Sequence, residues 1–231
     1  VSGGRFSVTE GQTNDITLDL DQAAVDGADS YIITIEPAVG DDPAPSSVHV
    51  LGGDFAGDSA QLTVSHSGAL GTDFADASGS FILATPSTAV ADDNHNGIWF
   101  LVPGETPTAS LELPALPTGW VYEGWVVDGS GPVSTGRFSS PSAAALDGAG
   151  ATAGPEATPP FPGQDYIDPA LDLTDGFSAV ITVEPEPDTS AAPYNIKPLI
   201  TMPISGALAP TAQSLDNQGS LILPGGSAVK L

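Results

Sequence analysis

The sequence predicts an all-β protein built from two similar β-sandwich domains. Gly and Pro, 27 and 22 of the 231 residues, recur along the whole chain, and both oppose long helices. Short stretches of alternating apolar and polar residues lie between turn residues, which is typical of strands with one buried face. Two segments of the chain return further on in similar form, which indicates a duplicated domain.

The predicted strands follow one another along most of the chain. They are residues 16–20, 31–35, 48–51, 61–64, 80–84, 98–102, 110–113, 120–127, 180–183 and 220–223. Residues 128–131, Asp-Gly-Ser-Gly, predict a hairpin loop with Gly where a positive φ is needed.

The repeats set the domain boundaries. Val-Ser-Gly-Gly-Arg-Phe at 1–6 returns as Val-Ser-Thr-Gly-Arg-Phe at 133–138, an offset of 132 positions. Residues 30–37 and 178–185 match at an offset of 148, so the second copy carries an insertion of 16 residues. We therefore predict copies at 1–103 and 104–231, divided near 103–107, with a Pro-rich insertion within 141–170.

The first copy begins at a point that the second copy reaches only after residues 113–127. We expect it to lack its N-terminal strands, either because the chain is a fragment or processed form, or because another chain supplies them. A sandwich without one strand has an open edge, which invites strand addition from a neighbour.

The segment 113–138 contains Leu-Pro-Ala-Leu-Pro, then Trp-Val-Tyr-Glu-Gly-Trp-Val-Val-Asp-Gly, then Gly-Pro-Val-Ser-Thr-Gly-Arg-Phe, and Ile-Thr-Val-Glu-Pro follows at 181–185. This order resembles the C-terminal extracytoplasmic domain of anti-sigma-K factors. Repeated copies of that module also resemble secreted or lipid-anchored proteins of Bacteroidetes and Rhodothermus-type bacteria.

The resemblance implies immunoglobulin-like β-sandwiches outside the cytoplasm, on the bacterial surface or beyond it, with any lipid anchor upstream of residue 1. It does not imply sigma-factor binding, which in that family belongs to a separate cytoplasmic domain. It supplies no catalytic residue.

The charge balance excludes some partners. With 29 acidic and 4 basic residues, the net charge is −25. Such a surface repels nucleic acid and anionic membranes, attracts divalent cations, and suits a saline habitat, where salt screens self-repulsion. The absence of Cys excludes disulfides and thiolate chemistry. No apolar run approaches the about 18 residues that a membrane span requires.

One motif has the start of a calcium loop. Asp92, Asn94 and Asn96 alternate as oxygen ligands before Gly97, but the twelfth position is Pro103 in place of the closing Glu. The alternative is a polar turn between two strands, for which Asn, Asp and Gly are common. No other cofactor is indicated.

The candidates for catalysis are less specific. Glu36 and Glu184, each before a Pro, and Glu186 could form a carboxylate pair, but Pro also ends strands, and the positions repeat in both copies. His49, His66 and His95 accompany no nucleophile-elbow motif.

Two groups of aromatic residues suggest surfaces. Trp120, Tyr122 and Trp125 could stack on a sugar, but the core is the favoured place for most of them. Phe161 and Tyr166, in the insertion, suit either a contact site or a packed loop. Val1 and Phe6, at the incomplete N-terminus, are further candidates for interaction.

These observations predict a non-enzymatic extracellular or cell-surface structural protein. We expect it to self-associate, as a homo-oligomer or as a filament or surface-array subunit that assembles by strand complementation. The alternative is an extracytoplasmic ligand-binding or sensory module for a sugar, a peptide or calcium.

Overall fold

The computed structural model describes residues 2–9, 14–147, 161–188, 190–218 and 223–231, and it is nearly all β. The strands are β1 (Ser30–Thr34), β2 (His49–Asp54), β3 (Ser59–Thr63), β4 (Gly79–Leu83), β5 (Gly97–Trp99), β6 (Leu101–Val102), β7 (Thr108–Ala109), β8 (Trp120–Asp128), β9 (Gly131–Phe138), β10 (Gly163–Asp165), β11 (Ser178–Pro185), β12 (Leu199–Thr201), β13 (Gln213–Asn217) and β14 (Gly225–Val229). A short helix α1 (Gln22–Asp26) and a 3₁₀-helix η1 (Ala91–Asn96) complete the elements.

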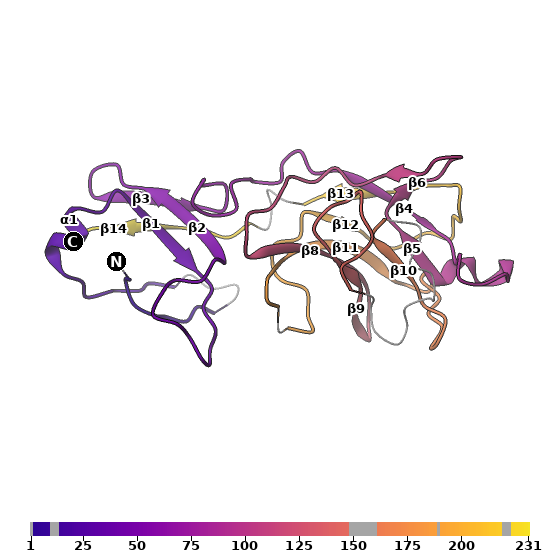
Figure 1. Cartoon of the computed structure of the whole chain (residues 1–231), viewed down its shortest axis with the longest axis horizontal. Helices are drawn as coiled ribbons and strands as arrows, with labels where there is room; N and C mark the ends of the chain where they lie inside the picture. Colours follow the sequence, from indigo (N-terminus) through magenta and orange to yellow (C-terminus); the bar gives the residue numbers. More distant parts are fainter. Residues whose placement is uncertain (1, 10–13, 148–160, 189, 219–222) are drawn as a thin grey trace.

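The strands form two main antiparallel sheets at opposite ends of an elongated molecule (Figure 1). The four-stranded sheet has the order β1-β2-β3-β14, and the C-terminus lies beside it. The eight-stranded sheet has the order β10-β5-β4-β13-β12-β11-β8-β9, and β6 and β7 form a separate pair. The prediction of an all-β protein is therefore confirmed. In the part of the chain that the structure describes, no helix has the length and apolar character to cross a membrane.

Most of the predicted strands are present. Residues 31–35, 48–51, 61–64, 80–84, 98–102, 120–127 and 180–183 all fall on strands or directly beside their ends. The predicted hairpin is confirmed, because Asp128 pairs with Gly131 across a two-residue turn. The Asp128 carboxylate accepts a hydrogen bond from the Ser130 N–H, and Gly131 has φ +130°.

Residues 16–20 are not a strand, and residues 110–113 contribute only an isolated bridge between Glu112 and Ser78. Within the described ranges, no strand pairs with residues 16–20. Alternation alone does not make a strand when its neighbour is missing. The strand predicted at 220–223 lies almost entirely outside the described residues.

The two sheets repeat one pairing register at an offset of 148. Ile33 lies opposite Leu51 in the four-stranded sheet, and Ile181 lies opposite Leu199 in the eight-stranded sheet. The same hydrogen bond closes both hairpins: Ile35 N–H donates to Val48 O, and Val183 N–H donates to Ile196 O, each at 2.9 Å. The sequence repeat is thus a repeat of backbone pairing.

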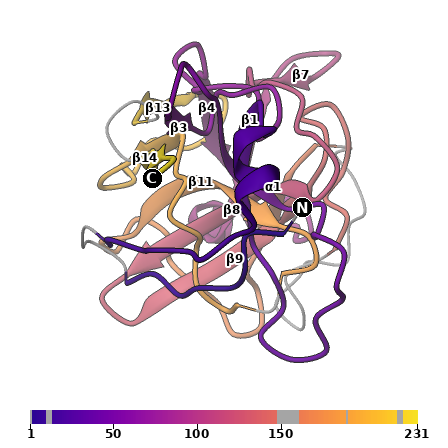
Figure 2. The same ribbon diagram turned by 90° about the vertical axis from the view of Figure 1, so that its left-hand side faces the viewer.

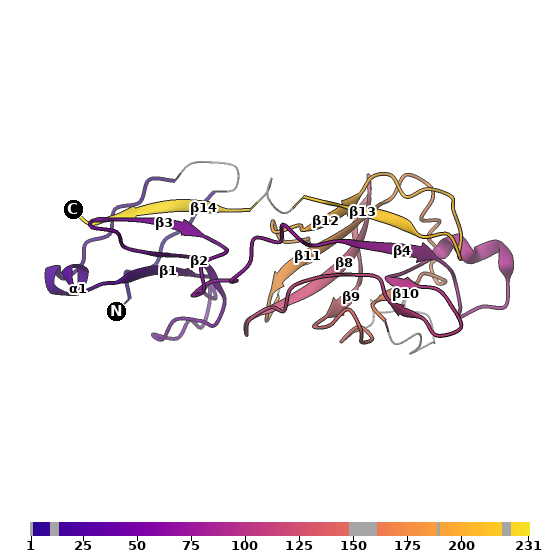
Figure 3. The ribbon, with the colours of Figure 1, turned by 90° about the horizontal axis from the view of Figure 1, so that it is seen from above.

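The strand after each repeated hairpin pair is exchanged between the sheets. β4 follows β3 in the chain but pairs with β13, whereas β14 follows β13 but pairs with β3 (Figure 3). The registers match, since Leu215 lies opposite Gly79 and Leu62 lies opposite Gly226. β4 and β14 therefore occupy the same position in the two sheets, β4 beside β13 and β14 beside β3.

This exchange divides the sheets differently from the predicted copies 1–103 and 104–231. β4 and β5 precede residue 103 but belong to the eight-stranded sheet, and β14 belongs to the four-stranded one. The predicted division into copies 1–103 and 104–231 describes the repeat in the sequence, and it stays a prediction. Of the predicted insertion at 141–170, residues 148–160 lie outside the described residues, and the rest includes β10.

A single cluster of buried apolar side chains runs through both sheets. It extends from Val50 and Leu62 in the four-stranded sheet to Phe81, Tyr122 and Ile181 in the eight-stranded sheet. Trp120 joins the two ends directly, because its indole N–H donates to the His49 carbonyl at 3.1 Å.

Candidate interaction site at the outer edge of β1

β1 is an edge strand, whereas its counterpart β11 is a central strand. β11 pairs with β12 on one side and with β8 on the other. β1 pairs with β2 only, within the described part of the chain. Ala179, Val180 and Ile181 on β11 are buried, but the matching Tyr31, Ile32 and Ile33 on β1 are only half-buried. The position beside β1 that corresponds to β8 is not taken by any described strand.

The backbone groups on this edge can be assigned from the ladder. Phe55 N–H donates to Asp29 O, so Tyr31 and Ile33, two and four residues further on, also direct their N–H and C=O groups toward β2. Ile32 and Thr34 consequently direct theirs outward. Among the described residues, neither has a backbone hydrogen bond on that side. An exposed row of this kind is a template for another strand.

The segments at 2–5 and 134–137 have the same local structure in the two copies. Gly4 and Gly136 have φ of +106° and +101°, a region that favours glycine. In each case the glycine N–H is hydrogen-bonded to the hydroxyl of a serine two residues earlier, Ser2 or Ser134. The counterpart of the end of β9 lies near β1, because a Cβ built on Gly3 would be 3.7 Å from the Tyr31 ring; in Figure 2 the N-terminus lies beside α1.

An arginine holds each of these segments against acidic side chains. Arg5 Nε lies 2.6 Å from the Asp41 carboxylate, and its Nη2 lies 3.8 Å from that of Glu36. Arg137 contacts Asp147 at 2.6 Å and Glu186 at 2.8 Å. The hydrogen bond from Arg5 lowers the pKa of Asp41.

The Glu-Pro pairs lie at the C-terminal ends of β1 and β11. The Thr34 hydroxyl donates to Glu36, which also accepts the Ser46 N–H at 3.1 Å. In the second copy, the Thr182 hydroxyl donates to Glu184, which accepts the Tyr194 N–H at 2.9 Å. Both glutamates thus occupy the same strand-end position in different sheets, and each is engaged by backbone and threonine rather than by a second carboxylate.

The residues predicted for calcium lie in and beside η1. Asp92 is exposed, Asn96 is buried, and the Asn94 side-chain oxygen accepts the Thr85 N–H at 3.2 Å. The Thr88 hydroxyl donates to Asp93 in the same turn. Within the described ranges, no group of three or more His, Asp or Glu side chains is arranged to hold a metal. Calcium binding stays a prediction.

The aromatic residues predicted for interaction differ in how far they are exposed. Phe161 packs with Ile82 and Trp99 and is 9% exposed, and Tyr166 is fully buried, with its hydroxyl donating to Ser134 O at 2.8 Å. The packed-loop alternative therefore describes both rings. Phe6 is half-buried, and Val1 lies outside the described residues.

Trp120, Tyr122 and Trp125 are all buried, as most of them were expected to be. His49 and His66 both contact Gly68, because His49 Nδ1 lies 2.8 Å from its carbonyl and the Gly68 N–H donates to His66 Nδ1 at 3.0 Å. His66 also contacts Asp54, and His95 lies apart from this pair, 3.7 Å from Asp172.

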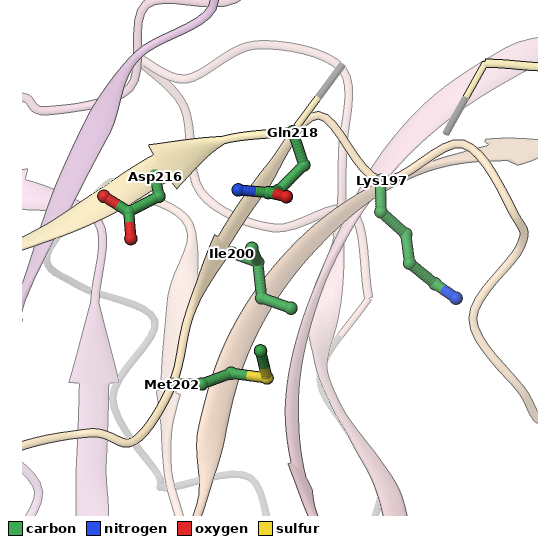
Figure 4. Close-up of a pocket in the computed structure, with 5 residues that line it drawn as sticks. All are labelled: Lys197, Ile200, Met202, Asp216 and Gln218. Atoms are coloured by element: carbon green, nitrogen blue, oxygen red, sulfur yellow. The ribbon is translucent and has the colours of Figure 1, made fainter. Parts of the chain in front are cut away.

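The structure also contains two shallow depressions. One is lined by Lys197, Ile200, Met202, Asp216 and Gln218, over β12 and β13 (Figure 4). The Lys197 and Asp216 side chains lie on opposite sides of Ile200 and do not converge on a common point. The other lies along residues 72–77 and 112–114.

Comparison with protein-family models, with curated proteins and with solved structures gives no match for this chain. The resemblance to the anti-sigma-K extracytoplasmic domain therefore stays an expectation from the sequence.

Sequence reasoning missed two buried polar groups. On β8 and β11, Glu123 accepts a hydrogen bond from Ser134, and the Trp125 indole donates to Thr182 at 2.8 Å. Near β10, the buried Asp165 accepts hydrogen bonds from Ser87 and from the Trp99 indole. No sequence signal identified them, because an isolated acidic residue on a strand is usually exposed.

Proposed function

We propose that this chain is a non-enzymatic structural and interaction protein of the bacterial cell surface or extracellular space. Its two copies are immunoglobulin-like sandwiches in tandem, and its subunits join by strand complementation into a homo-oligomer, filament or surface array. The observation that carries this proposal is the outer edge of β1, which has no paired strand among the described residues. Its counterpart in the other sheet, β11, is paired on both edges.

The comparison between copies supports the proposal that the edge of β1 accepts a strand, rather than being a strand edge that is only exposed to solvent. The flanking Ser-x-Gly-Arg segment and the Thr-x-Glu-Pro strand end are formed in both copies with the same hydrogen bonds. The site is therefore shaped on both sides before any strand enters it. Pre-organisation of this kind lowers the entropy that a binding strand must lose.

The composition supports an exposed, salt-bathed location. A net charge of −25 with four basic residues keeps a protein soluble but opposes self-association through repulsion. Assembly should therefore require salt, which shortens the range of that repulsion to about 3 Å at 1 M.

The test is the solution mass as a function of salt. Light scattering after size exclusion should show species larger than the 23.1-kDa chain at high salt. Ile32→Pro removes the outward N–H without removing a bond to β2, so it should reduce assembly, while Ile32→Val should assemble normally. A monomer at every salt concentration, with one cooperative thermal transition, would overturn the proposal.

A further inference from the structure

We propose that the outer edge of β1 binds an extended strand with the residue pattern of β8, donated by another polypeptide chain, in the antiparallel register that β8 has on β11. This inference rests on the proposed function and adds the identity of the donor strand. The chain's own β8 is not available, because β9 and β11 hold both of its edges.

The register follows from the repeat. On β11, the residues Val180, Thr182 and Glu184 lie opposite Trp125, Glu123 and Val121 of β8. Their counterparts on β1 at the same offset are Ile32, Thr34 and Glu36. Ile32 and Thr34 are also the residues whose backbone groups point outward. A donor strand in this register would therefore pair with the outward backbone groups of both residues.

One side-chain contact gives the edge a preference for tryptophan. In the eight-stranded sheet, the Trp125 indole N–H donates to the Thr182 hydroxyl oxygen at 2.8 Å, while that hydroxyl donates to Glu184. Thr34 has the same arrangement, because its hydroxyl donates to Glu36. The Thr34 oxygen can thus accept an indole N–H from a tryptophan opposite Ile32.

The donor residue opposite Ile33 can be larger than its counterpart in β8, which is Gly124. Gly124 lies opposite Ile181, and a Cβ built on it would lie 2.1 Å from the Thr135 hydroxyl. The residue that corresponds to Thr135 in the first copy is Gly3. A donor strand with Ala at this position therefore avoids that clash on β1.

The probe is a synthetic peptide of residues 118–129, added to the complete chain, with hydrogen exchange followed residue by residue by NMR. Saturating peptide should slow exchange of the Ile32 and Thr34 amides at least tenfold. The Tyr31 and Ile33 amides, which already face β2, should change little and act as an internal control. The matched control peptide is N-methylated at the position of Glu123, which removes one N–H directed at β1, and it should fail to protect.

A double-mutant comparison tests the tryptophan contact. Thr34→Val should weaken binding of the peptide severalfold, and a peptide with Trp125→Phe should bind the parent and Thr34→Val proteins about equally. Equal weakening of both peptides by Thr34→Val would overturn the assigned contact and register.

The outcomes separate this inference from the proposed function. If the chain assembles in salt but the peptide protects neither Ile32 nor Thr34, the donor assignment is wrong and assembly uses another surface. If the chain is monomeric yet binds the peptide in this register, the edge is an acceptor and self-association is wrong. If residues 118–129 protect the edge only when fused upstream of residue 1, donation by another chain is overturned.

Discussion

Glu123 and Glu184 are carboxylic acids held away from water on neighbouring strands of the eight-stranded sheet. Burial raises the pKa of Glu123 to about 7, and the nearby charge of Glu184 contributes to that rise. Burial also raises the pKa of Glu184, one of whose oxygens has no hydrogen-bond partner. The folded state therefore favours the protonated form of both acids, and ionisation at neutral pH destabilises it.

Glu123→Gln should stabilise the protein at pH 8 by about 1–3 kcal/mol but change little at pH 5. In the folded state the pKa of Glu123 lies above its unfolded value, so its stabilising contribution is complete below the unfolded pKa and is lost as the pH rises through the folded one. Gln keeps the carbonyl that accepts the Ser134 hydrogen bond. Urea denaturation at both pH values measures the difference.

The matched control is Glu105→Gln, on an exposed side chain. It removes one negative charge from the protein, as Glu123→Gln does, but it removes no buried carboxylate. If both variants gain equally at pH 8, the effect comes from net charge rather than from the burial of Glu123.

Gly4→Ala and Gly136→Ala test whether the repeated motif has the same backbone in both copies. A positive φ at either position strains alanine, at a cost of about 1–2 kcal/mol. At Gly136 the added Cβ would also lie 2.8 Å from Ala145 Cβ and from Asp147 O, whereas at Gly4 the nearest atom lies at 4.0 Å. We expect both variants to be destabilised, Gly136→Ala more strongly, in thermal denaturation. Equal losses would contradict the tighter packing in the second copy.

At the scale of elements, the reciprocal exchange of β4 and β14 ties the two sheets together. β14 is mostly exposed, but its end is anchored: Lys230 N–H donates to Asp58 O, and its ammonium lies 4.4 Å from the Phe55 ring centroid and donates to Ala28 O. The four-stranded sheet therefore depends on the last residues of the chain. The two copies should unfold as one cooperative unit.

Paired cysteines test this exchange, and the chain has no native cysteine to interfere. Gln61 lies opposite Ser227, and Ser214 lies opposite Ser80. Directly opposed residues in antiparallel strands are close enough for a disulfide. The double variants Gln61→Cys with Ser227→Cys, and Ser80→Cys with Ser214→Cys, should each oxidise within one chain and raise the melting temperature relative to the reduced form.

A non-reducing gel gives the deciding measurement. The Ser80–Ser214 pair is the control, because β4 lies in the middle of the chain. A ladder of cross-linked chains for the Gln61–Ser227 pair alone would show that β14 is donated to another molecule, contrary to the exchange within one chain.

At the scale of the whole molecule, the sequence predicted strands better than it predicted their partners. Alternation located β1, β4 and β8, because the pattern depends only on neighbouring residues. β13 and β14 were missed, since Gln213–Asn217 contains one buried apolar residue and Gly225–Val229 is largely exposed. The exchange of strands is a long-range choice of pairing that no local pattern encodes.

The candidate site was predicted only in outline. The offset between the repeats led us to expect a copy without its first strands, which stays a prediction; the structure shows that β1 pairs with β2 only, among the described residues. The direction of the free backbone groups and the Thr34–Glu36 contact required coordinates, because they depend on pairing register. The aromatic residues of the insertion were ambiguous in sequence because Phe161 and Tyr166 suit a core as well as a surface.

The net charge of −25 makes a prediction about the complete molecule. Folding brings the carboxylates closer together, so their repulsion destabilises the folded state more than the extended one, and salt reduces this difference as the screening length falls from about 30 Å at 0.01 M to about 3 Å at 1 M. The melting temperature should therefore rise by several degrees between 0.01 and 1 M NaCl, measured by calorimetry at pH 8. Replacing the exposed Asp15, Asp19 and Asp76 by Asn should raise it at low salt and flatten the dependence. Because strand addition would also stabilise the fold at high salt, the series is run with Ile32→Pro as well. A rise that vanishes in that variant would come from assembly, and one that persists comes from screening within the single chain.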